Sequence, residues 1–348
     1  GPDATPDFSR ASWFSMLFAA GMGIGLMFWG VAEPMVYYNG ESGTPLSAEP
    51  LTPHAADLAM SATMFHWGLH GWGIYAVVGL SLAFFYHNKG MPLTIRSAFY
   101  PLIGNRIWGW SGHLIDIVAV LATIFGLATT LGLGAAQASG GLHFLFGIPD
   151  EINTRIAIVV GVSFIAVISV VRGLDGGVKV LSNINMAVAG LLLLFVFIAG
   201  PTLIITKGFG TTAVNYLTDL LPLSNWIGRS DVTWMQDWTI FYWAWWVSWS
   251  PFVGMFIARI SRGRTIRELI IAVLLVPAVV TLVWMSTFGL SALHQAQNGI
   301  GALAQGASSV NLATFQMLEN LPFAQITTGL GILLVLVFFV TSSDSGSL

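Results

Sequence analysis

The chain has 348 residues, of which 55% are hydrophobic and only 8% are charged, and its formal net charge is -3. So few charges cannot solvate the surface of a soluble protein of this length, and the mean hydropathy of +0.77 points the same way. We therefore predict an all-α polytopic membrane protein, and the absence of cysteine excludes disulfides and thiolate chemistry from these residues.

Apolar runs of about 20 residues, the length that crosses a bilayer, predict eight membrane spans within a single domain, residues 1–348. They are expected at residues 11–38, 57–87, 112–139, 154–172, 182–206, 237–259, 268–290 and 324–345. Ten Lys and Arg residues fall in loops that alternate to one side and three in loops of the other. This asymmetry places the N-terminus and the loop from Arg259 to Arg267 in the cytoplasm.

Residues that break helices are expected to interrupt the first and the sixth span. They are Gly21, Gly23 and Gly25 in the first span, and Ser248, Ser250, Pro251 and Gly254 in the sixth. Broken helices at membrane depth persist only where they are buried in protein or line a polar cavity. The breaks would match if residues 11–206 and 237–348 were inverted repeats, with substrate and ion sites between the broken helices. Glycines that serve only helix packing are the alternative.

The sixth span is rich in tryptophan. Trp245, Trp246 and Trp249 lie three or four residues apart, so they form a continuous indole wall on one helix face. The second span carries a further aromatic group, which consists of Trp67, Trp72 and Tyr75. If the two groups face each other, they form a box suited to a quaternary ammonium ion. An aromatic belt at the membrane interface explains single tryptophans but not this density.

A set of oxygen ligands is predicted at the last span. The carbonyl of Phe338 and the hydroxyls of Thr341 and Ser342 share a helix face because they are three and four residues apart. With carbonyls of the broken first span near Ala19 and Met22, they would make a neutral oxygen cage, which suits a monovalent cation. Hydroxyls that bond only to their own helix backbone are the alternative.

Ionisable residues in the spans are further candidates. Asp344 is expected to pair with Arg259 as a gate at the cytoplasmic mouth, or in a purely structural contact. His66 and His70 are one helical turn apart but lack a third metal ligand. The sequence has no phosphate-binding loop and no nucleophile with a base, so ATP drive and enzymatic activity are not expected. A channel would need a ring of like residues.

The chain resembles the betaine/choline/carnitine transporter family over essentially all its residues. The matching motifs are Gly21-Met22-Gly23-Ile24-Gly25, Glu33-Pro34, the tryptophan stretch of residues 238–251, and Thr341-Ser342-Ser343-Asp344-Ser345-Gly346. The family implies twelve spans with a leucine-transporter-like five-plus-five inverted-repeat core in the bacterial inner membrane. This chain would be a fragment of such a protein. A homotrimer in the lipid bilayer is also implied, and nucleic acid is not an expected partner.

The resemblance implies import of a zwitterionic trimethylammonium osmolyte, most plausibly glycine betaine, by sodium symport and alternating access. The substrate residues would be Trp67, Trp72, Tyr75, Trp245, Trp246 and Trp249, with Met22, Gly23 and Gly25. Amide groups of the broken first span would meet the substrate carboxylate. One sodium ion would bind Ala19, Met22, Phe338, Thr341 and Ser342. A second would bind Phe252 together with threonines among Thr123, Thr129 and Thr130.

Subtype is indicated by two positions. Choline transporters of this family tend to carry aspartate where this chain has Gly25, so Gly25 indicates a substrate that brings its own carboxylate. The hydroxyl pair of Thr341 and Ser342 indicates sodium coupling. A sodium-independent exchanger for carnitine or betaine, and a choline transporter, remain the alternatives. No cofactor is expected apart from Na+ as the coupling ion.

Overall fold

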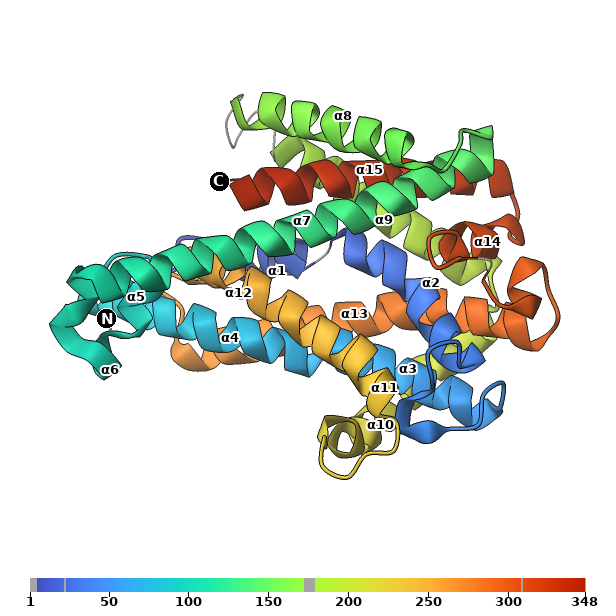
Figure 1. Ribbon diagram of the computed structural model, residues 1–348, viewed down its shortest axis with the longest axis horizontal. Helices are drawn as coiled ribbons and strands as arrows, with labels where there is room; N and C mark the ends of the chain where they lie inside the picture. The colour runs from blue at the N-terminus through green and yellow to red at the C-terminus, as the bar shows by residue number, and fades with distance from the viewer. Residues whose placement is uncertain (1–4, 22, 172–178, 308, 348) are drawn as a thin grey trace. The chain divides into compact units, whose positions relative to one another are not determined.

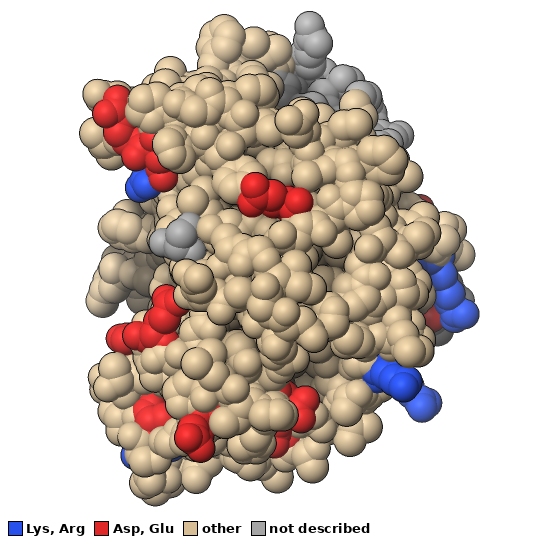
Figure 2. Space-filling view, turned by 90° about the vertical axis from the view of Figure 1, so that its right-hand side faces the viewer, with Lys and Arg blue, Asp and Glu red and all other residues tan. Residues whose placement is uncertain are grey.

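The computed structural model describes residues 5–21, 23–171, 179–307 and 309–347 (Figure 1). The described residues form helices joined by turns and loops, with a single isolated bridge between Glu41 and Gly43 and no strand. The predicted all-α class is therefore confirmed. Figure 2 shows a face on which uncharged residues predominate, as the low content of charged residues leads one to expect.

The chain folds into two compact units. The first unit contains residues 1–21, 66–128 and 240–280, and the second contains residues 22–65, 129–239 and 281–348. The long helices α7 (Trp110–Phe146) and α13 (Ile266–Gln297) contribute a part to each unit. The inverted repeats, residues 11–206 and 237–348, stay a prediction.

In the first unit, helices α4 (Leu69–Ala83) and α12 (Phe241–Ile260) pack along each other through small residues. Besides these two and parts of α7 and α13, the unit contains α1 (Arg10–Gly21), η2 (Phe84–Asn88), α5 (Ile95–Ala98), α6 (Tyr100–Ile103) and η3 (Gly104–Trp108). A Cβ atom at Gly79 of α4 would lie 2.8 Å from Cγ2 of Ile257, and one at Gly254 of α12 would overlap Val78. Glycine at these two positions allows the close approach of α4 to α12.

In the second unit, α15 packs against α8 and α9 (Figure 1). The elements are α2 (Ile24–Asn39), η1 (Pro45–Ser47), α3 (Pro53–Trp67), α8 (Ile152–Val171), α9 (Lys179–Ala199), α10 (Thr202–Ser224), α11 (Val232–Trp234), η5 (Met235–Ile240), η6 (Ala302–Gln305), α14 (Ala313–Glu319) and α15 (Ala324–Ser347). The start of α2 is fixed by two hydrogen bonds. Trp284 donates to the Leu26 carbonyl at 2.9 Å, and Thr314 donates to the Met27 carbonyl at 3.0 Å.

Several helices are suited to a membrane. Among the described residues, four helices are long and apolar enough to cross one, and a bent pair of helices would make a fifth. The four are residues 53–88, 110–146, 266–297 and 324–341. They agree with four of the eight predicted spans, while α8 is apolar but shorter.

The predicted break in the first span is confirmed, and the second span contains a break that was not predicted. Helix α1 ends at Gly21, and α2 begins at Ile24 after Gly23 in an extended conformation. In the second span, α3 ends at Trp67 and α4 begins at Leu69. The residue between them, Gly68, has a backbone conformation outside the helical region, at φ -98° and ψ -134°.

The predicted break in the sixth span is wrong. Helix α12 continues through Pro251, although proline lacks the N–H group that would bond to the carbonyl four residues earlier. That carbonyl belongs to Val247, and the Ser250 hydroxyl donates to it at 2.8 Å. Ser248 likewise donates to the Trp245 carbonyl at 2.7 Å. The serines therefore satisfy backbone oxygens and allow the helix to remain whole at membrane depth.

The fifth span ends earlier than predicted. Helix α9 stops at Ala199, and α10 leaves at 110° to it after Gly200 and Pro201. The Thr202 hydroxyl donates at 2.8 Å to the Phe197 carbonyl, one of those left without a helical partner at the end of α9. The prediction of a helix from 182 to 206 gave too little weight to Pro201, which cannot continue the hydrogen-bond ladder.

Candidate functional site

Trp246 of α12 lies at the centre of an aromatic cluster in the first unit. Its ring is 6.0 Å from that of Trp67, 5.8 Å from that of Trp72 and 4.7 Å from that of Tyr75. Trp245 contacts Trp67 from the side, with ring centroids 5.7 Å apart and an angle of 83° between the planes. Trp245 and Trp246 of the predicted indole wall therefore face the aromatic group of the second span.

Two groups that the sequence did not single out hold the Trp246 indole in place. Its Nε1 donates to the carbonyl of His66 at 2.9 Å, just before the break at Gly68. The face of the ring lies against Gly71, where a Cβ atom would overlap it. The indole is therefore fixed by a hydrogen bond at its edge and by contact of its face with the backbone of Gly71. Only the spacing of Gly71 from Trp67 and Tyr75 in the sequence hinted at this role.

The histidines of the second span stack on aromatic rings of α12. His66 lies 4.5 Å from Tyr242 with the planes 18° apart, and His70 lies 5.7 Å from Trp243 with the planes 23° apart. In the part of the chain that the structure describes, no three His, Cys, Asp or Glu residues gather around a common point. These stacked rings adjoin the aromatic cluster through Tyr242, whose ring lies 5.5 Å from that of Trp67.

Trp249 belongs to another part of the same helix face. Its ring lies 5.9 Å from that of Phe252, and a Cβ atom at Gly126 of α7 would lie 3.1 Å from Trp249 Cδ1. Thr123, one turn before Gly126, donates to the Ala119 carbonyl at 3.0 Å. Thr129 and Thr130 follow on α7 in the second unit, and Thr130 is buried. A second sodium site at Phe252 and these threonines stays a prediction.

Part of the first predicted sodium site is described. Thr341 donates to the Phe338 carbonyl at 3.1 Å, which is a bond to its own helix backbone as the alternative interpretation expects, so the sodium site stays a prediction. Asn185 of α9, which sequence reasoning missed, donates to the Thr341 hydroxyl at 3.5 Å. Its Oδ1 is buried without a hydrogen-bond partner among the described residues. An asparagine within an apolar run was the available signal in the sequence.

The other predicted ligands of that site are incompletely described. Ala19 lies in α1, but its side chain and that of Ser342 lie outside the described residues, as does the whole of Met22. Gly23 precedes α2, and no side chain caps the first amide groups of that helix. Gly25 is buried in its first turn. A helix start of this kind favours an anion.

The predicted gate is only half described. Arg259 is exposed near the end of α12, whereas the side chain of Asp344 lies outside the described residues. Their pairing stays a prediction. A buried carboxylate that is described is Glu33 of α2, which accepts a hydrogen bond from the Tyr37 hydroxyl at 2.9 Å. Helix α2 continues beyond Pro34, so Glu33 does not mark its end.

A second aromatic group, which sequence reasoning missed, packs around Trp29 and Tyr37 of α2. Tyr37 lies 5.3 Å from Trp234 and 5.0 Å from Trp238, and Trp29 lies 5.5 Å from Trp238, with all three ring pairs close to perpendicular. The guanidinium of Arg229 lies over Trp234 at 5.5 Å. Of these tryptophans, Trp238 was interpreted from the sequence as part of one stretch with those of α12, but it lies in the π-helical segment η5 that precedes α12.

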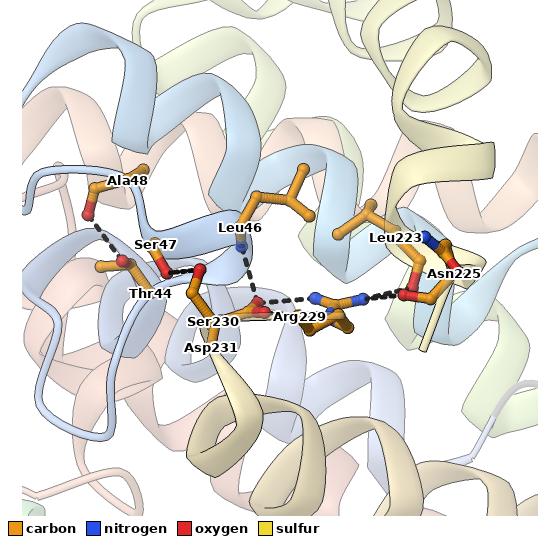
Figure 3. A network of polar contacts seen from close by, with 9 residues as sticks. All are labelled: Thr44, Leu46, Ser47, Ala48, Leu223, Asn225, Arg229, Ser230 and Asp231. Atoms are coloured by element: carbon orange, nitrogen blue, oxygen red, sulfur yellow. Dashed lines mark hydrogen bonds and ion pairs between the residues drawn. The ribbon is translucent and has the colours of Figure 1, made fainter. Parts of the chain in front are cut away.

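Arg229 and Asp231 form a buried ion pair that ties two loops of the second unit together (Figure 3). The guanidinium donates to both carboxylate oxygens, at 2.8 and 2.6 Å, and to the Leu223 carbonyl at 2.7 Å. Asp231 also accepts from the Leu46 amide at 2.8 Å. Each side chain is only 4% exposed. The loop at η1 is thereby fixed to the loop after α10.

This network predicts a dependence of loop stability on pH. Burial opposes ionisation of Asp231, but the hydrogen bonds from Arg229 and Leu46 outweigh it and lower the pKa of the carboxyl below its ordinary value of 3.8. A lowered pKa stabilises the folded state above the ordinary value, and this stabilisation is lost as pH falls through the folded pKa. We expect amide exchange in residues 44–48 to accelerate only below about pH 4. Acceleration already at pH 6 would contradict this assignment.

Comparison with known proteins gives consistent results. A family model described as BCCT, betaine/carnitine/choline family transporter, matches residues 1–348. Glycine betaine transporter 1 of Vibrio parahaemolyticus is 60% identical over 349 residues, which cover 100% of this chain and 66% of the relative. A glycine betaine/proline/choline/ectoine transporter of that organism is 58% identical, with coverages of 100% and 62%. A glycine betaine transporter of Bacillus subtilis is 45% identical, with coverages of 99% and 67%. The chain thus spans 62 to 67% of the length of these relatives.

Proposed function

Because the chain belongs to the betaine/carnitine/choline family of transporters, we propose that it binds a zwitterionic trimethylammonium solute, with glycine betaine as first candidate, for transport across the membrane. The resemblance noted in the sequence is thereby confirmed. The family comprises integral inner-membrane transporters rather than enzymes, in agreement with the predicted fold class and location.

The observation that carries the proposal is the buried cluster around Trp246. A trimethylammonium group has no N–H to donate, so it is recognised by the faces of aromatic rings. Trp67, Trp72, Tyr75 and Trp246 offer such rings, and each is at most 7% exposed. A desolvated contact of this kind contributes about 2 kcal/mol. Three relatives at 45 to 60% identity carry glycine betaine in their names.

The charges of the first unit favour a zwitterion over a cation. Its described carboxylates are Asp7, Asp116 and Glu268, and each lies within 3.6 Å of an arginine nitrogen. None of them is therefore available to neutralise a bound cation in the aromatic cluster. A betaine brings its own carboxylate and needs no such partner. Gly25, in place of a carboxylate residue, supports the same choice.

Sodium symport by alternating access is the proposed mechanism. The oxygens of Phe338 and Thr341, with Asn185 beside them, are uncharged oxygen ligands of the kind that suits a monovalent cation. Each sodium ion that enters down a potential of 100 mV contributes about 2.3 kcal/mol, before any concentration gradient. Two ions would support strong accumulation of a neutral solute.

A binding titration tests this proposal. Glycine betaine is added to the purified full-length protein with and without sodium at constant ionic strength, and intrinsic tryptophan fluorescence is recorded. We expect quenching that depends on sodium. Quenching that is indifferent to sodium would favour the exchanger, and the absence of quenching by any betaine would contradict the substrate assignment.

A matched pair of variants tests the sodium site in the same titration. Thr341→Ala removes the hydroxyl beside the Phe338 carbonyl and is expected to raise the sodium concentration needed for half-maximal quenching. Thr327→Ala is the control, because Thr327 lies on the same helix and also bonds to its own backbone. An equal effect of both variants would assign Thr341 a structural role only.

Broader specificity is the second candidate, and it rests on one observation. The relative at 58% identity is named for proline, choline and ectoine as well as glycine betaine. Competition with choline in the same titration separates the candidates. Displacement of glycine betaine by choline at comparable concentration would favour broad specificity, whereas displacement only at large excess would favour the zwitterion.

Alanine at Gly71 is expected to weaken glycine betaine binding about tenfold or more, because its methyl group would displace the Trp246 indole. Gly73 is the matched control. It lies on the same helix, and a Cβ atom there meets nothing within 4 Å. Gly73→Ala should keep full affinity, and the helix should gain up to about 1 kcal/mol in stability. Equal affinity of both variants would show that the packing of Gly71 against Trp246 does not determine the affinity for glycine betaine.

A further inference from the structure

We propose that the segment between α4 and α7 is a docking surface for anionic phospholipid headgroups. This lipid surface is defined by Lys89, Leu102, Arg106, Trp108 and Trp110, all of which are exposed. It belongs entirely to the first unit and to a part of the chain that the transport site does not use. The proposal therefore stands or falls independently of the substrate.

The first feature that carries this inference is a surplus of positive charge. The described residues of the first unit include three carboxylates, and each is paired with an arginine: Asp7 with Arg262, Asp116 with Arg96, and Glu268 with Arg10. Five further basic residues have no carboxylate partner among the described ion pairs. They are Lys89, Arg106, Arg259, Arg264 and Arg267.

The basic segments of the first unit meet at one end of it. The His87 ring bonds to the Ala258 carbonyl at 2.9 Å, which joins η2, the segment after α4, to the last turn of α12. Asp7 pairs with Arg262 in the loop that follows α12, and Arg10 pairs with Glu268 in the first turn of α13. The positive charges without a carboxylate partner among the described residues are thus concentrated at this end, where they would attract an anionic surface within about 10 Å.

The second feature is exposed apolar surface within the same segment. Leu102 is 77% exposed, Trp108 is 53% exposed and Trp110 is 78% exposed. Tryptophan and leucine next to lysine and arginine are the composition of segments that lie in the headgroup layer, with apolar groups toward the acyl chains and cations at the phosphates. This combination of exposed apolar and basic side chains is not expected on a surface that faces only water.

The third feature is the fixed conformation of the segment. Arg96 donates to Asp116 through both its amide and its Nε, at 3.0 and 2.5 Å. Ile107 is completely buried, while its neighbours Arg106 and Trp108 point outward as exposed residues. The exposed side chains are therefore presented by an ordered scaffold.

The position of the segment identifies the occupant. It connects two helices that are long and apolar enough to cross a membrane, residues 53–88 and 110–146, so it must lie at a membrane surface. No acidic residue occurs between Asp57 and Asp116. A bilayer with anionic headgroups satisfies both the charge and the apolar surface, and it is already adjacent. A soluble protein partner would explain the charge but not the location.

The absence of cysteine allows a direct test on the full-length protein in vesicles. Leu102→Cys is labelled with an environment-sensitive fluorophore, and quenching is measured with brominated phosphatidylglycerol, brominated phosphatidylcholine and aqueous iodide. We expect brominated phosphatidylglycerol to quench about twofold more than brominated phosphatidylcholine at equal content. Ala304→Cys, an exposed position in the loop at η6, is the control label and should show no such preference.

Charge variants complete the test. Lys89→Gln with Arg106→Gln should equalise quenching by the two lipids, whereas Arg155→Gln, which removes an arginine of the second unit, should leave the preference unchanged. An unchanged thermal unfolding midpoint of the double variant shows that it is folded. Equal quenching by both lipids in the parent would overturn the proposal. Quenching by iodide alone, or by none of the three, would also overturn it, the latter because another protein segment then covers Leu102.

Discussion

Alanine in place of Trp246 is expected to weaken glycine betaine binding by about two orders of magnitude. The ring supplies a desolvated cation-π contact of about 2 kcal/mol, and its hydrogen bond to the His66 carbonyl contributes about 1 kcal/mol to the order of the site. A loss of about 1.4 kcal/mol corresponds to a tenfold change in affinity, so the sum corresponds to somewhat more than a hundredfold. Trp67, Trp72 and Tyr75 all contact this ring. Replacing Trp246 should therefore reduce the affinity more than replacing any other single residue of the cluster.

Two further substitutions make this experiment specific. Trp246→Phe keeps an aromatic face but removes the N–H that bonds to His66, so its affinity should lie between those of the parent and the alanine variant. Trp226→Phe is the control, because Trp226 is 73% exposed in a loop of the second unit. Affinity is measured by calorimetry, since fluorescence changes when a tryptophan is removed. Binding by Trp246→Ala within about threefold of the parent would exclude this cluster as the ammonium site.

The chemistry of the aromatic site could be predicted from the sequence, because Trp245, Trp246 and Trp249 lie three or four residues apart on one helix and the second span holds a further aromatic group. The packing that orients it could not. The role of Gly71 depends on which residue of another helix lies opposite, and no local pattern encodes that. The acceptor for the Trp246 indole is a backbone carbonyl, which has no signature in the sequence at all.

The helix breaks could likewise be predicted only in part from the local sequence. Glycines at 21, 23 and 25 predicted a break that the structure contains, whereas Pro251 predicted one that it does not. The difference lies in Ser250, whose hydroxyl satisfies the carbonyl that proline leaves without its partner. At Pro201 the hydroxyl that bonds to the corresponding carbonyl, that of Phe197, belongs to Thr202 after the proline, and the chain turns there. A proline therefore has to be read together with the hydroxyl residues around it.

Asparagine in place of Asp231 is expected to lower the free energy needed to separate the loop at η1 from the loop after α10 by about 3 kcal/mol, because Arg229 would remain buried without its carboxylate. The substitution keeps the size of the side chain, so packing around it is preserved. Hydrogen exchange measured by mass spectrometry should show amides of residues 44–48 and 225–231 exchanging about a hundredfold faster. Exchange in α4 and α12, which belong to the other unit, should not change.

Arg155→Gln provides the comparison that isolates the effect of burial. It breaks the ion pair with Asp150 in the same unit, but there the side chains are 37% and 26% exposed rather than 4% each. An ion pair that water can reach contributes less than about 1 kcal/mol, so exchange near residue 150 should increase by no more than about fivefold. If the two variants had similar effects, the buried pair would be no more than a surface contact, and the loop at η1 would be held by its other hydrogen bonds. A large difference would instead make Asp231 the residue that fixes this loop.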